Sequence, residues 1–324
     1  MTKSSILVIH QGALGDVVAA FPALLKLKAA FGPIDIICQN NIGSLVRQLG
    51  IADNYFPLEA AAFASMYSSH VDPVVKKILF TYSKVILFSG SRSLEKTLLS
   101  ITDSSIYRIP PRPDSGHNMH ISRHILLNLV RYGLLEGSDN RVFCRLSPGV
   151  HADRRDPNYH PIKIFIHPGS GSRKKCWPIS NFIKIASLIE AKGRRPEFIL
   201  GPAEHDFFDV LSRRKTLKAK IHKIDALAEL AVLLKTGGGF IGNDSGVSHL
   251  SAFLGLPTVA VFGPSDPDIW APVGRSVEIV KSRCECSPCF DSGTVGCEKI
   301  ECFRDISCED VLAAFYRLVP FDQK

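Results

Sequence analysis

Short apolar runs alternate with amphipathic stretches along both halves of the chain. In the first half, the runs at 5–10, 34–38 and 84–88 have the length of buried strands, and residues 17–31 have helical spacing. Strands that alternate with helices in this way favour a parallel sheet with helices on both faces. The first half is therefore predicted to be an α/β domain.

The same alternation resumes after residues 147–161, a stretch without periodic apolar positions that reads as a linker. Strands are predicted at 162–167, 197–200, 239–242 and 258–262, and helices at 179–192, 226–235, 246–254 and 310–318. Two such units predict an α/β fold of paired Rossmann-like domains that face a cleft lined by strand carboxyl ends. We assign residues 1–155 to the first domain, 160–308 to the second and 309–324 to a closing helix, for which packing back on the first domain is one option.

A turn with two glycines joins the first predicted strand to the first helix. It spans residues 11–16, with Asp16 at the point where the helix begins. Aspartate is favoured there as a helix cap, but a carboxylate at the end of a strand is also placed for catalysis, so both interpretations stay open. The G-x-x-G spacing differs from the G-x-G-x-x-G of dinucleotide-binding turns.

Two later segments combine small residues with polar or charged ones directly after a strand. Residues 167–178 read HPGSGSRKKCWP, and residues 242–250 read GNDSGVSHL. Backbone amides, hydroxyls and a lysine suit a diphosphate, and a helix amino end presents free amides and a positive dipole. The alternatives are a solvated basic loop for the first segment, a helix cap for Asp244 and an ordinary hydrogen-bonded histidine for His249.

Two further patterns resemble metal sites, but each has a simpler interpretation. Asp266 and Asp268 have a D-x-D spacing, for which we prefer a turn because proline and glycine surround them. Six of the nine cysteines lie between Cys284 and Cys308, with one C-x-x-C pair at 286–289. A second such pair is missing, so zinc, a disulfide and free thiols all stay open. We expect no catalytic metal and no cofactor.

The formal net charge of +8 and a pI near 9.0 favour anionic partners, although a merely soluble basic surface is the plain alternative. No nucleic-acid-binding module is recognisable, so nucleic acid is not an expected partner. No run approaches the roughly 20 apolar residues that span a bilayer, and the apolar run at 6–9 lacks the form of a signal peptide. We expect a cytoplasmic protein, for which a place at an anionic membrane surface is one option.

Three stretches together resemble glycosyltransferase family 9, the ADP-heptose–lipopolysaccharide heptosyltransferases. They are 6–25 with G-x-x-G-D-V-V, 166–178 with H-P-G and K-x-W-P, and 241–274 with G-N-D-S-G-x-S-H-L and F-G-P-S-D-P, in the order that the family has. The resemblance implies a GT-B fold with the donor held mainly by the second domain. It also implies inversion at the anomeric carbon without an essential metal.

The resemblance also implies roles for individual residues. Asp16 matches the proposed general base, and Lys175 matches the lysine that neutralises the leaving diphosphate. The donor contacts implied by the family's other motifs are Ser170, Gly171, Glu204, Asp244, Ser245, Gly246 and His249. The loop before Lys175 is one residue longer here, and for Glu204 an exposed acid at a helix start is the alternative.

The implied partners are ADP-heptose as donor and an anionic glycolipid as acceptor. The basic residues with which the family's first domain grips a particular acceptor find no match in this sequence, so the acceptor position stays open. A GT-B enzyme that uses another nucleotide sugar for surface polysaccharide is the first alternative. A non-catalytic protein that binds nucleotide sugars is the second.

Overall fold

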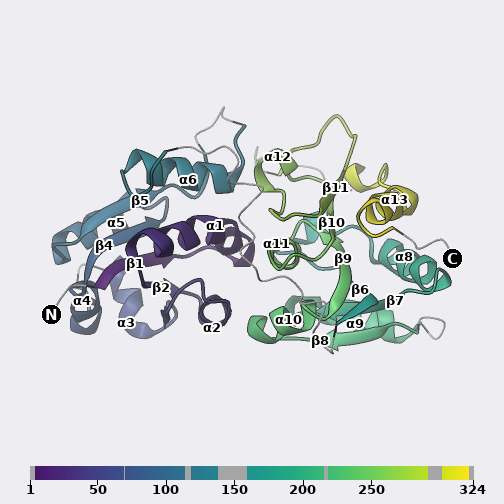
Figure 1. Cartoon of the computed structure of the whole chain (residues 1–324), viewed down its shortest axis with the longest axis horizontal. Helices are drawn as coiled ribbons and strands as arrows, with labels where there is room; N and C mark the ends of the chain where they lie inside the picture. Colours follow the sequence, from purple (N-terminus) through teal and green to yellow (C-terminus); the bar gives the residue numbers. More distant parts are fainter. Residues whose placement is uncertain are drawn as a thin grey trace. The chain divides into compact units, whose positions relative to one another are not determined.

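The computed structural model describes residues 4–68, 70–113, 118–137, 159–214, 218–290 and 301–320. The chain divides into two compact units, Met1–Asn140 and Arg141–Lys324 (Figure 1). Most of the predicted linker at 147–161 lies outside the described residues, so the predicted domain boundary stays a prediction. Among the residues described, no helix combines the length and apolar character needed to span a bilayer.

The first unit is built on a five-stranded parallel sheet in the order β3-β2-β1-β4-β5. Its strands are β1 Ser4–His10, β2 Ile34–Cys38, β3 Asn54–Pro57, β4 Tyr82–Phe88 and β5 Ser105–Ile109. Its helices are α1 Leu14–Phe31, α2 Asn40–Gln48, α3 Ala61–Ala64, η1 Ser65–Tyr67, α4 Pro73–Leu79, α5 Arg92–Ile101 and α6 Ile121–Arg131. The strands and the helix predicted in this half are therefore confirmed.

Both faces of the first sheet are covered, which explains why its central strand is a continuous apolar run. Leu7 and Ile9 face a cluster that includes Met66, Val75 and Leu98, contributed by η1, α4 and α5. Since successive strand residues point to opposite faces, the alternate residues of β1 face the side where α1 and α6 pack together (Figure 1).

The second unit is built on a six-stranded parallel sheet in the order β11-β10-β9-β6-β7-β8. Its strands are β6 His160–His167, β7 Arg195–Leu200, β8 Lys220–Lys223, β9 Gly237–Asn243, β10 Thr258–Phe262 and β11 Val277–Lys281. Its helices are η2 Arg173–Lys175, α8 Ile179–Ala191, η3 Pro202–Glu204, α9 His205–Ser212, α10 Leu227–Leu234, α11 Gly246–Phe253, α12 Pro267–Trp270, η4 Glu301–Phe303 and α13 Cys308–Leu318. Counted within each unit, the strand order is 3-2-1-4-5 in the first sheet and 3-2-1-4-5-6 in the second, which is Rossmann-like, so the predicted α/β class with parallel sheets is confirmed.

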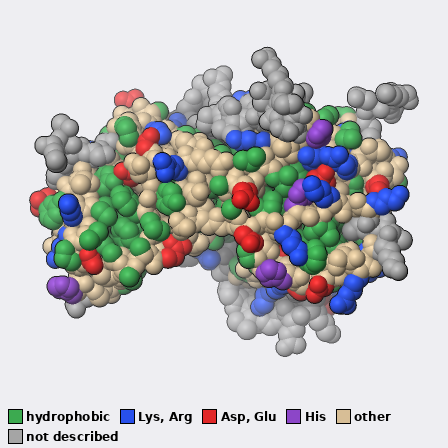
Figure 2. Space-filling model, turned by 90° about the horizontal axis from the view of Figure 1, so that it is seen from below, with side chains coloured by type: hydrophobic (Ala, Val, Ile, Leu, Met, Phe, Trp, Pro, Cys, Tyr) green, Lys and Arg blue, Asp and Glu red, His purple; other side chains and the backbone are tan. Residues whose placement is uncertain are grey.

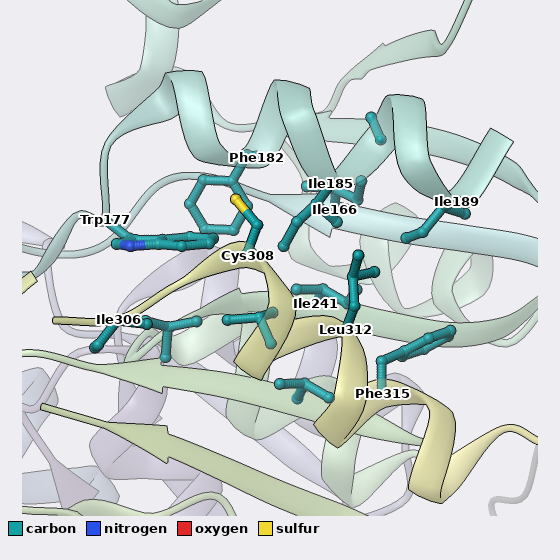
Figure 3. Packing of buried hydrophobic residues seen from close by; sticks show 14 of the residues in the cluster. Ile166, Trp177, Phe182, Ile185, Ile189, Ile241, Ile306, Cys308, Leu312 and Phe315 are labelled. Carbon is teal, nitrogen blue, oxygen red and sulfur yellow. The ribbon is translucent and has the colours of Figure 1, made fainter. Parts of the chain in front are cut away.

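Helix α13 closes the core of the second unit. Its Phe315 is fully buried, and a Cβ placed on Gly239 of β9 would lie 2.7 Å from the Phe315 ring. Figure 3 shows the buried side of α13 against residues of α8 and β9, with Trp177 and Phe182 at one end of the cluster. The sequence left open whether this helix packs on the first domain, and the structure places its buried side in the core of the second.

Candidate functional site

The adjacent strands β6 and β9 mark the point where the strand order of the second sheet reverses. At this point connections leave neighbouring strands in opposite directions, and ligands of open α/β sheets bind outside the strand carboxyl ends there. β6 ends at His167 and β9 ends at Asn243. The two segments singled out from the sequence follow these ends directly, so the structure brings them together.

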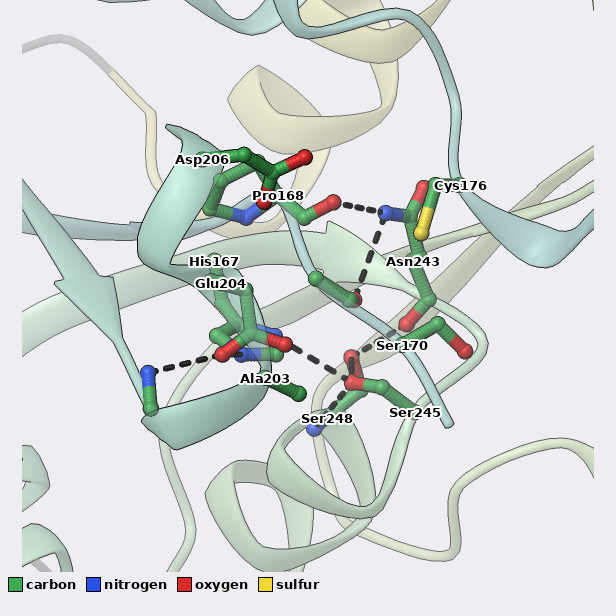
Figure 4. A network of polar contacts seen from close by, with 12 residues as sticks. His167, Pro168, Ser170, Cys176, Ala203, Glu204, Asp206, Asn243, Ser245 and Ser248 are labelled. Atoms are coloured by element: carbon green, nitrogen blue, oxygen red, sulfur yellow. Dashed lines mark hydrogen bonds and ion pairs between the residues drawn. The ribbon is translucent and has the colours of Figure 1, made fainter. Parts of the chain in front are cut away.

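Asn243 ties the two segments to each other. Its side chain is fully buried, and its Oδ1 accepts a hydrogen bond of 3.0 Å from the amide of Trp177. Its Nδ2 donates to the carbonyls of Pro168 (2.7 Å) and Gly169 (3.3 Å), as Figure 4 shows. Trp177 is itself buried and packs edge-to-face on Phe182. The loop after β6 is therefore fixed at both ends, and the interpretation of it as a merely solvated basic loop is wrong.

The carboxylate of Asp244 collects two donors on one oxygen. Lys175 Nζ lies 2.8 Å and Ser265 Oγ 2.6 Å from Oδ2, and both are hydrogen-bonded to it. Ser170 Oγ donates to the Asp244 backbone carbonyl at 2.6 Å. The side chains of Lys175 and Asp244 are 19% and 6% exposed, so this ion pair is largely withdrawn from water. An ammonium group is thus held in a fixed place beside the end of β9.

The cap of helix α11 is Ser245 rather than Asp244, which corrects the cap interpretation of the sequence. Ser245 Oγ accepts a hydrogen bond from the Ser248 amide, and Ser248 Oγ donates to the Asn243 carbonyl. The amino end of α11 is therefore directed to the carboxyl edge of the sheet, where it favours an anion. His249 follows one turn into the helix and is buried.

The basic side chains of the loop after β6 have different surroundings. Lys175 lies over the Phe290 ring, 4.5 Å from its centroid. Arg173 is exposed, pairs with Asp206 at 2.6 Å and stacks on Phe207. Lys175 is thus the cation that the Asp244 network positions, whereas Arg173 is engaged at the start of α9. At Gly171, a Cβ would meet no atom within 4 Å, so the loop is open there.

Glu204 is buried, so its interpretation as an exposed helix-start acid is wrong. Its Oε2 accepts a hydrogen bond of 2.7 Å from the Gly201 amide and lies 3.8 Å from His167 Nε2. Burial alone would raise the pKa of Glu204, but His167 and the Gly201 amide outweigh it and lower the pKa. A Cβ on Gly169 would lie 2.2 Å from Glu204 Oε1, so glycine is required at that point of the loop. Its contact with a donor ribose stays a prediction.

In the first unit, Asp16 occupies the third position of α1. Its Oδ2 accepts a hydrogen bond of 3.0 Å from the Ala13 amide, which confirms the helix-cap interpretation. The preceding turn is compact, because a Cβ on Gly12 would lie 2.7 Å from the Asp16 Cβ. The Gly12 amide donates to Nδ1 of His10, and burial lowers the pKa of His10 to about 4. Asp16 is only half-buried, so a catalytic role stays a prediction compatible with the cap.

Sequence reasoning gave no role to Asn243 and Ser265, although both organise the site. Asn243 is the last residue of β9, and Ser265 follows β10 within the F-G-P-S-D-P motif. One signal could have identified both residues. Each is a small polar residue at or just after the end of a buried strand, at the carboxyl edge of the sheet to which the other motifs also belong. Asp266 caps α12 by accepting from the Asp268 amide, so the preferred turn interpretation of the D-x-D spacing is confirmed.

The cysteines do not assemble a metal site within the described residues. Cys284 and Cys286 have sulfur atoms 3.2 Å apart, whereas Cys302 and Cys308 are buried in the core of the second unit. No group of three potential ligands among His, Cys, Asp and Glu was found in the described part of the chain. Cys144 and Cys297 lie outside it.

Comparisons with known proteins point to one family. The family model "Glycosyltransferase family 9 (heptosyltransferase)" matches residues 143–298. Lipopolysaccharide heptosyltransferase 1 of Pseudomonas aeruginosa is 26% identical over 180 residues, which are 54% of this chain and about half (47%) of that relative's length. Lipooligosaccharide heptosyltransferase 2 of Campylobacter jejuni is 27% identical over 92% of this chain and 93% of its own length.

Two solved structures are similar over nearly the whole chain. The glycosyl transferase family 9 protein of Veillonella parvula has a TM-score of 0.71 at 18% identity, covering 98% of both chains. The Escherichia coli ADP-heptose lps heptosyltransferase II has a TM-score of 0.70 at 16% identity, covering 97% of this chain and 98% of its own. At this level of identity the likeness shows the fold, and it confirms the predicted GT-B class.

Proposed function

Because the chain belongs to glycosyltransferase family 9, we propose that it transfers a heptose from ADP-heptose to the core of a lipopolysaccharide acceptor. The relatives that match it are named lipopolysaccharide or lipooligosaccharide heptosyltransferases. The observation that carries the proposal is the position of Lys175. Its ammonium is held by Asp244 beside the amino end of α11, at the reversal of strand order, which is where open α/β sheets bind ligands.

The second unit binds the donor in this proposal. The diphosphate lies against Lys175 and the amino end of α11, where a fixed cation and the helix dipole both favour negative charge. The open loop at Ser170 and Gly171 and the helix residues Ser245, Gly246 and His249 contact the rest of the donor. Glu204 contacts the ribose with the oxygen that the Gly201 amide does not use.

The transfer is a single displacement that inverts the anomeric carbon. The acceptor oxygen forms a bond to that carbon while the bond from carbon to the diphosphate oxygen breaks, and Asp16 takes the proton of the acceptor hydroxyl. The Ala13 amide donates a hydrogen bond to the Asp16 carboxylate and so holds it at the start of α1. Positioning of both substrates supplies much of the rate enhancement in this proposal.

The charge that develops on the departing diphosphate is matched by protein groups. Lys175 and the α11 amide end supply positive charge where a metal ion does so in other transferases. We propose on this ground that the reaction needs no metal. The acceptor is an anionic glycolipid, and we place the enzyme in the cytoplasm, at the inner face of the membrane that carries the acceptor.

A donor-by-acceptor assay with mass-spectrometric detection tests the proposal. Purified enzyme is incubated with ADP-heptose, or with UDP- and GDP-linked sugars, and with lipopolysaccharide that lacks core heptose. We expect the acceptor to gain one heptose with ADP-heptose alone. Transfer from a UDP or GDP donor but not from ADP-heptose would contradict the assignment of the donor.

A further inference from the structure

The first unit has a basic cavity outside the site described above. The cavity has a volume of about 340 Å³ and lies between the end of η1, α4 and α5. Its lining is mostly polar: Ser68, His70, Val71, Lys76, Lys96, Thr97, Ser100 and Ile101. Two lysines, a histidine and three hydroxyls form a donor set that suits a phosphate group.

This cavity is distinct from the turn that carries Asp16, although Tyr67, next to the lining residue Ser68, accepts a hydrogen bond from Gln11 Nε2 of that turn. Helix α5 starts just after the carboxyl end of β4 and runs back along the sheet, away from the edge where Asp16 lies. The lining residues of α5 belong to its later part, 96–101, and therefore lie toward the opposite edge. A ligand here would not occupy the position of a reacting acceptor hydroxyl.

The charge around the cavity is positive. Residues 65–101 contain five Lys or Arg and two Asp or Glu. Both acids are engaged, since Asp72 caps α4 by accepting from the Val74 amide and Glu95 pairs with Arg108 at 2.7 Å. Within the residues described here, no ion pair joins Lys76 or Lys96 to a carboxylate.

Large apolar side chains are exposed on the same elements. Val74 of α4 and Leu99 of α5 are 58% and 57% exposed, and Phe80 at the end of α4 is 45% exposed. Figure 2 shows hydrophobic side chains gathered over the first unit, with Lys, Arg, Asp and Glu side chains around them. Apolar side chains beside lysines are the combination by which a protein surface enters the headgroup region of a membrane.

We propose that this α4–α5 surface (Val74, Phe80, Leu99 and the Lys76–Lys96 cavity) docks on a bilayer that contains anionic phospholipids. A headgroup phosphate occupies the cavity between the two lysines, and the apolar side chains lie at the level of the acyl-chain boundary. Charge complementarity selects this partner over a second protein, because residues 65–101 carry five Lys or Arg against two acids that are already engaged. The inference does not depend on which sugar the enzyme transfers.

Vesicle co-sedimentation of the full chain tests the surface. Vesicles of phosphatidylcholine mixed with phosphatidylglycerol should bind the protein, and vesicles of phosphatidylcholine alone should bind it weakly. The double substitution Lys76→Glu and Lys96→Glu should reduce partitioning by about tenfold or more, since each lysine near an anionic surface contributes about fivefold. The matched control, Lys218→Glu with Lys220→Glu on the second unit, changes the net charge equally and should reduce partitioning far less.

A second pair of variants tests the apolar contribution. Leu99→Ser should weaken vesicle binding several-fold, whereas Val232→Ser, at a position of the second unit that is 54% exposed, should leave it unchanged. Equal effects of the two lysine pairs, or of the two serine variants, would overturn the proposal. Release of the protein by inorganic phosphate beyond that by chloride of equal ionic strength would assign the cavity to a soluble anion instead.

Two controls distinguish a loss of vesicle binding from a loss of folding and from a loss of transfer activity. Unfolding temperatures of the variants identify any that fold poorly, and Lys76→Gln with Lys96→Gln then replaces the charge reversal. Transfer to an acceptor dispersed in detergent should be unchanged in every variant. An inactive wild-type enzyme would contradict the proposed function. If the wild type is active but the variants of the α4–α5 surface bind vesicles as well as it does, the proposed membrane-binding surface is contradicted.

Discussion

The buried carboxylates of the second unit are held by specific hydrogen-bond and ion-pair partners, and these partners fix the positions of the charged groups. Asp244 is matched by Lys175 and Ser265, and Glu204 by His167 and the Gly201 amide. A buried charge without such partners would be strongly destabilising. The networks therefore fix the position of the Lys175 ammonium before any ligand is considered.

His10 should make the stability of the first unit depend on pH. Burial lowers its pKa from 6.5 to about 4, so the folded protein holds it neutral while the unfolded chain protonates it more readily. The resulting stability is fully present above pH 6.5 and is lost as the pH falls through 4, by about 3 kcal/mol in total. Urea unfolding at several pH values should show a steeper loss for the wild type than for His10→Gln. Parallel pH profiles would contradict the assignment.

Substitutions should separate the helix-capping role of Asp16 from its proposed role as the base. Asp16→Asn keeps a side-chain oxygen that can accept from the Ala13 amide, so stability should change little. Transfer should nevertheless fall by about 10²-fold or more, since the amide cannot accept the acceptor proton. Asp16→Ala should lose the same activity and about 1 kcal/mol of stability as well. Turnover of the Asn variant close to that of the wild type, measured with saturating donor, would remove Asp16 from the role of base.

The sequence motifs predicted which segments form the candidate site, but not the contacts that each side chain makes. The segments at 167–178 and 242–250 do meet at one edge of the second sheet. The sequence could not tell which of two adjacent capping residues, Asp244 or Ser245, caps α11, because both types are favoured at that position. It could not tell that Glu204 is buried, since this depends on contacts with His167 and Gly169, which are distant in the sequence. Ser265 was missed for the same reason, because it meets Asp244 only through the pairing of β9 and β10.

At the scale of elements, interior strands were predictable and edge strands were not. The predicted strands correspond to β1, β2, β4, β6, β7, β9 and β10, which all have a neighbour on each side. The missed strands are the four at the edges: β3, β5, β8 and β11. Edge strands are half-exposed and mix polar with apolar residues, as in Lys220–Lys223, so they lack the continuous apolar run that marks a strand buried on both faces.

The docking of α13 on the second sheet should depend on the absence of a side chain at residue 239. Gly239→Ala places a methyl group 2.7 Å from the Phe315 ring, which should cost about 1–3 kcal/mol. Phe315→Leu removes the atoms that the methyl group meets. A double-mutant cycle by urea unfolding should therefore show the pair to be less destabilised than the sum of the single changes. Strict additivity would mean that the helix accommodates the methyl group by another movement.

At the scale of the whole molecule, the two units share the strand order 3-2-1-4-5 and carry the turns with the proposed catalytic residues at equivalent points. In the first unit, the Asp16 turn follows β1, and in the second, the loop with Lys175 follows β6, the corresponding strand. This equivalence explains why the alternation of strands and helices, together with three short motifs, was enough to predict a GT-B fold. The boundary between the units was not fixed by the same pattern, because a linker has no periodic burial.

The central claim is that the second unit binds a nucleoside diphosphate through protein charge alone. Calorimetric titration of ADP in the presence of EDTA tests this claim directly, with Lys175→Ala as the variant and Lys218→Ala as the matched control. We predict that the wild type and the control bind ADP equally well with and without EDTA. Lys175→Ala should bind it about tenfold or more weakly, as expected for the loss of a charge-assisted contact. Binding that disappears in EDTA, or that is unchanged in Lys175→Ala, would contradict the account.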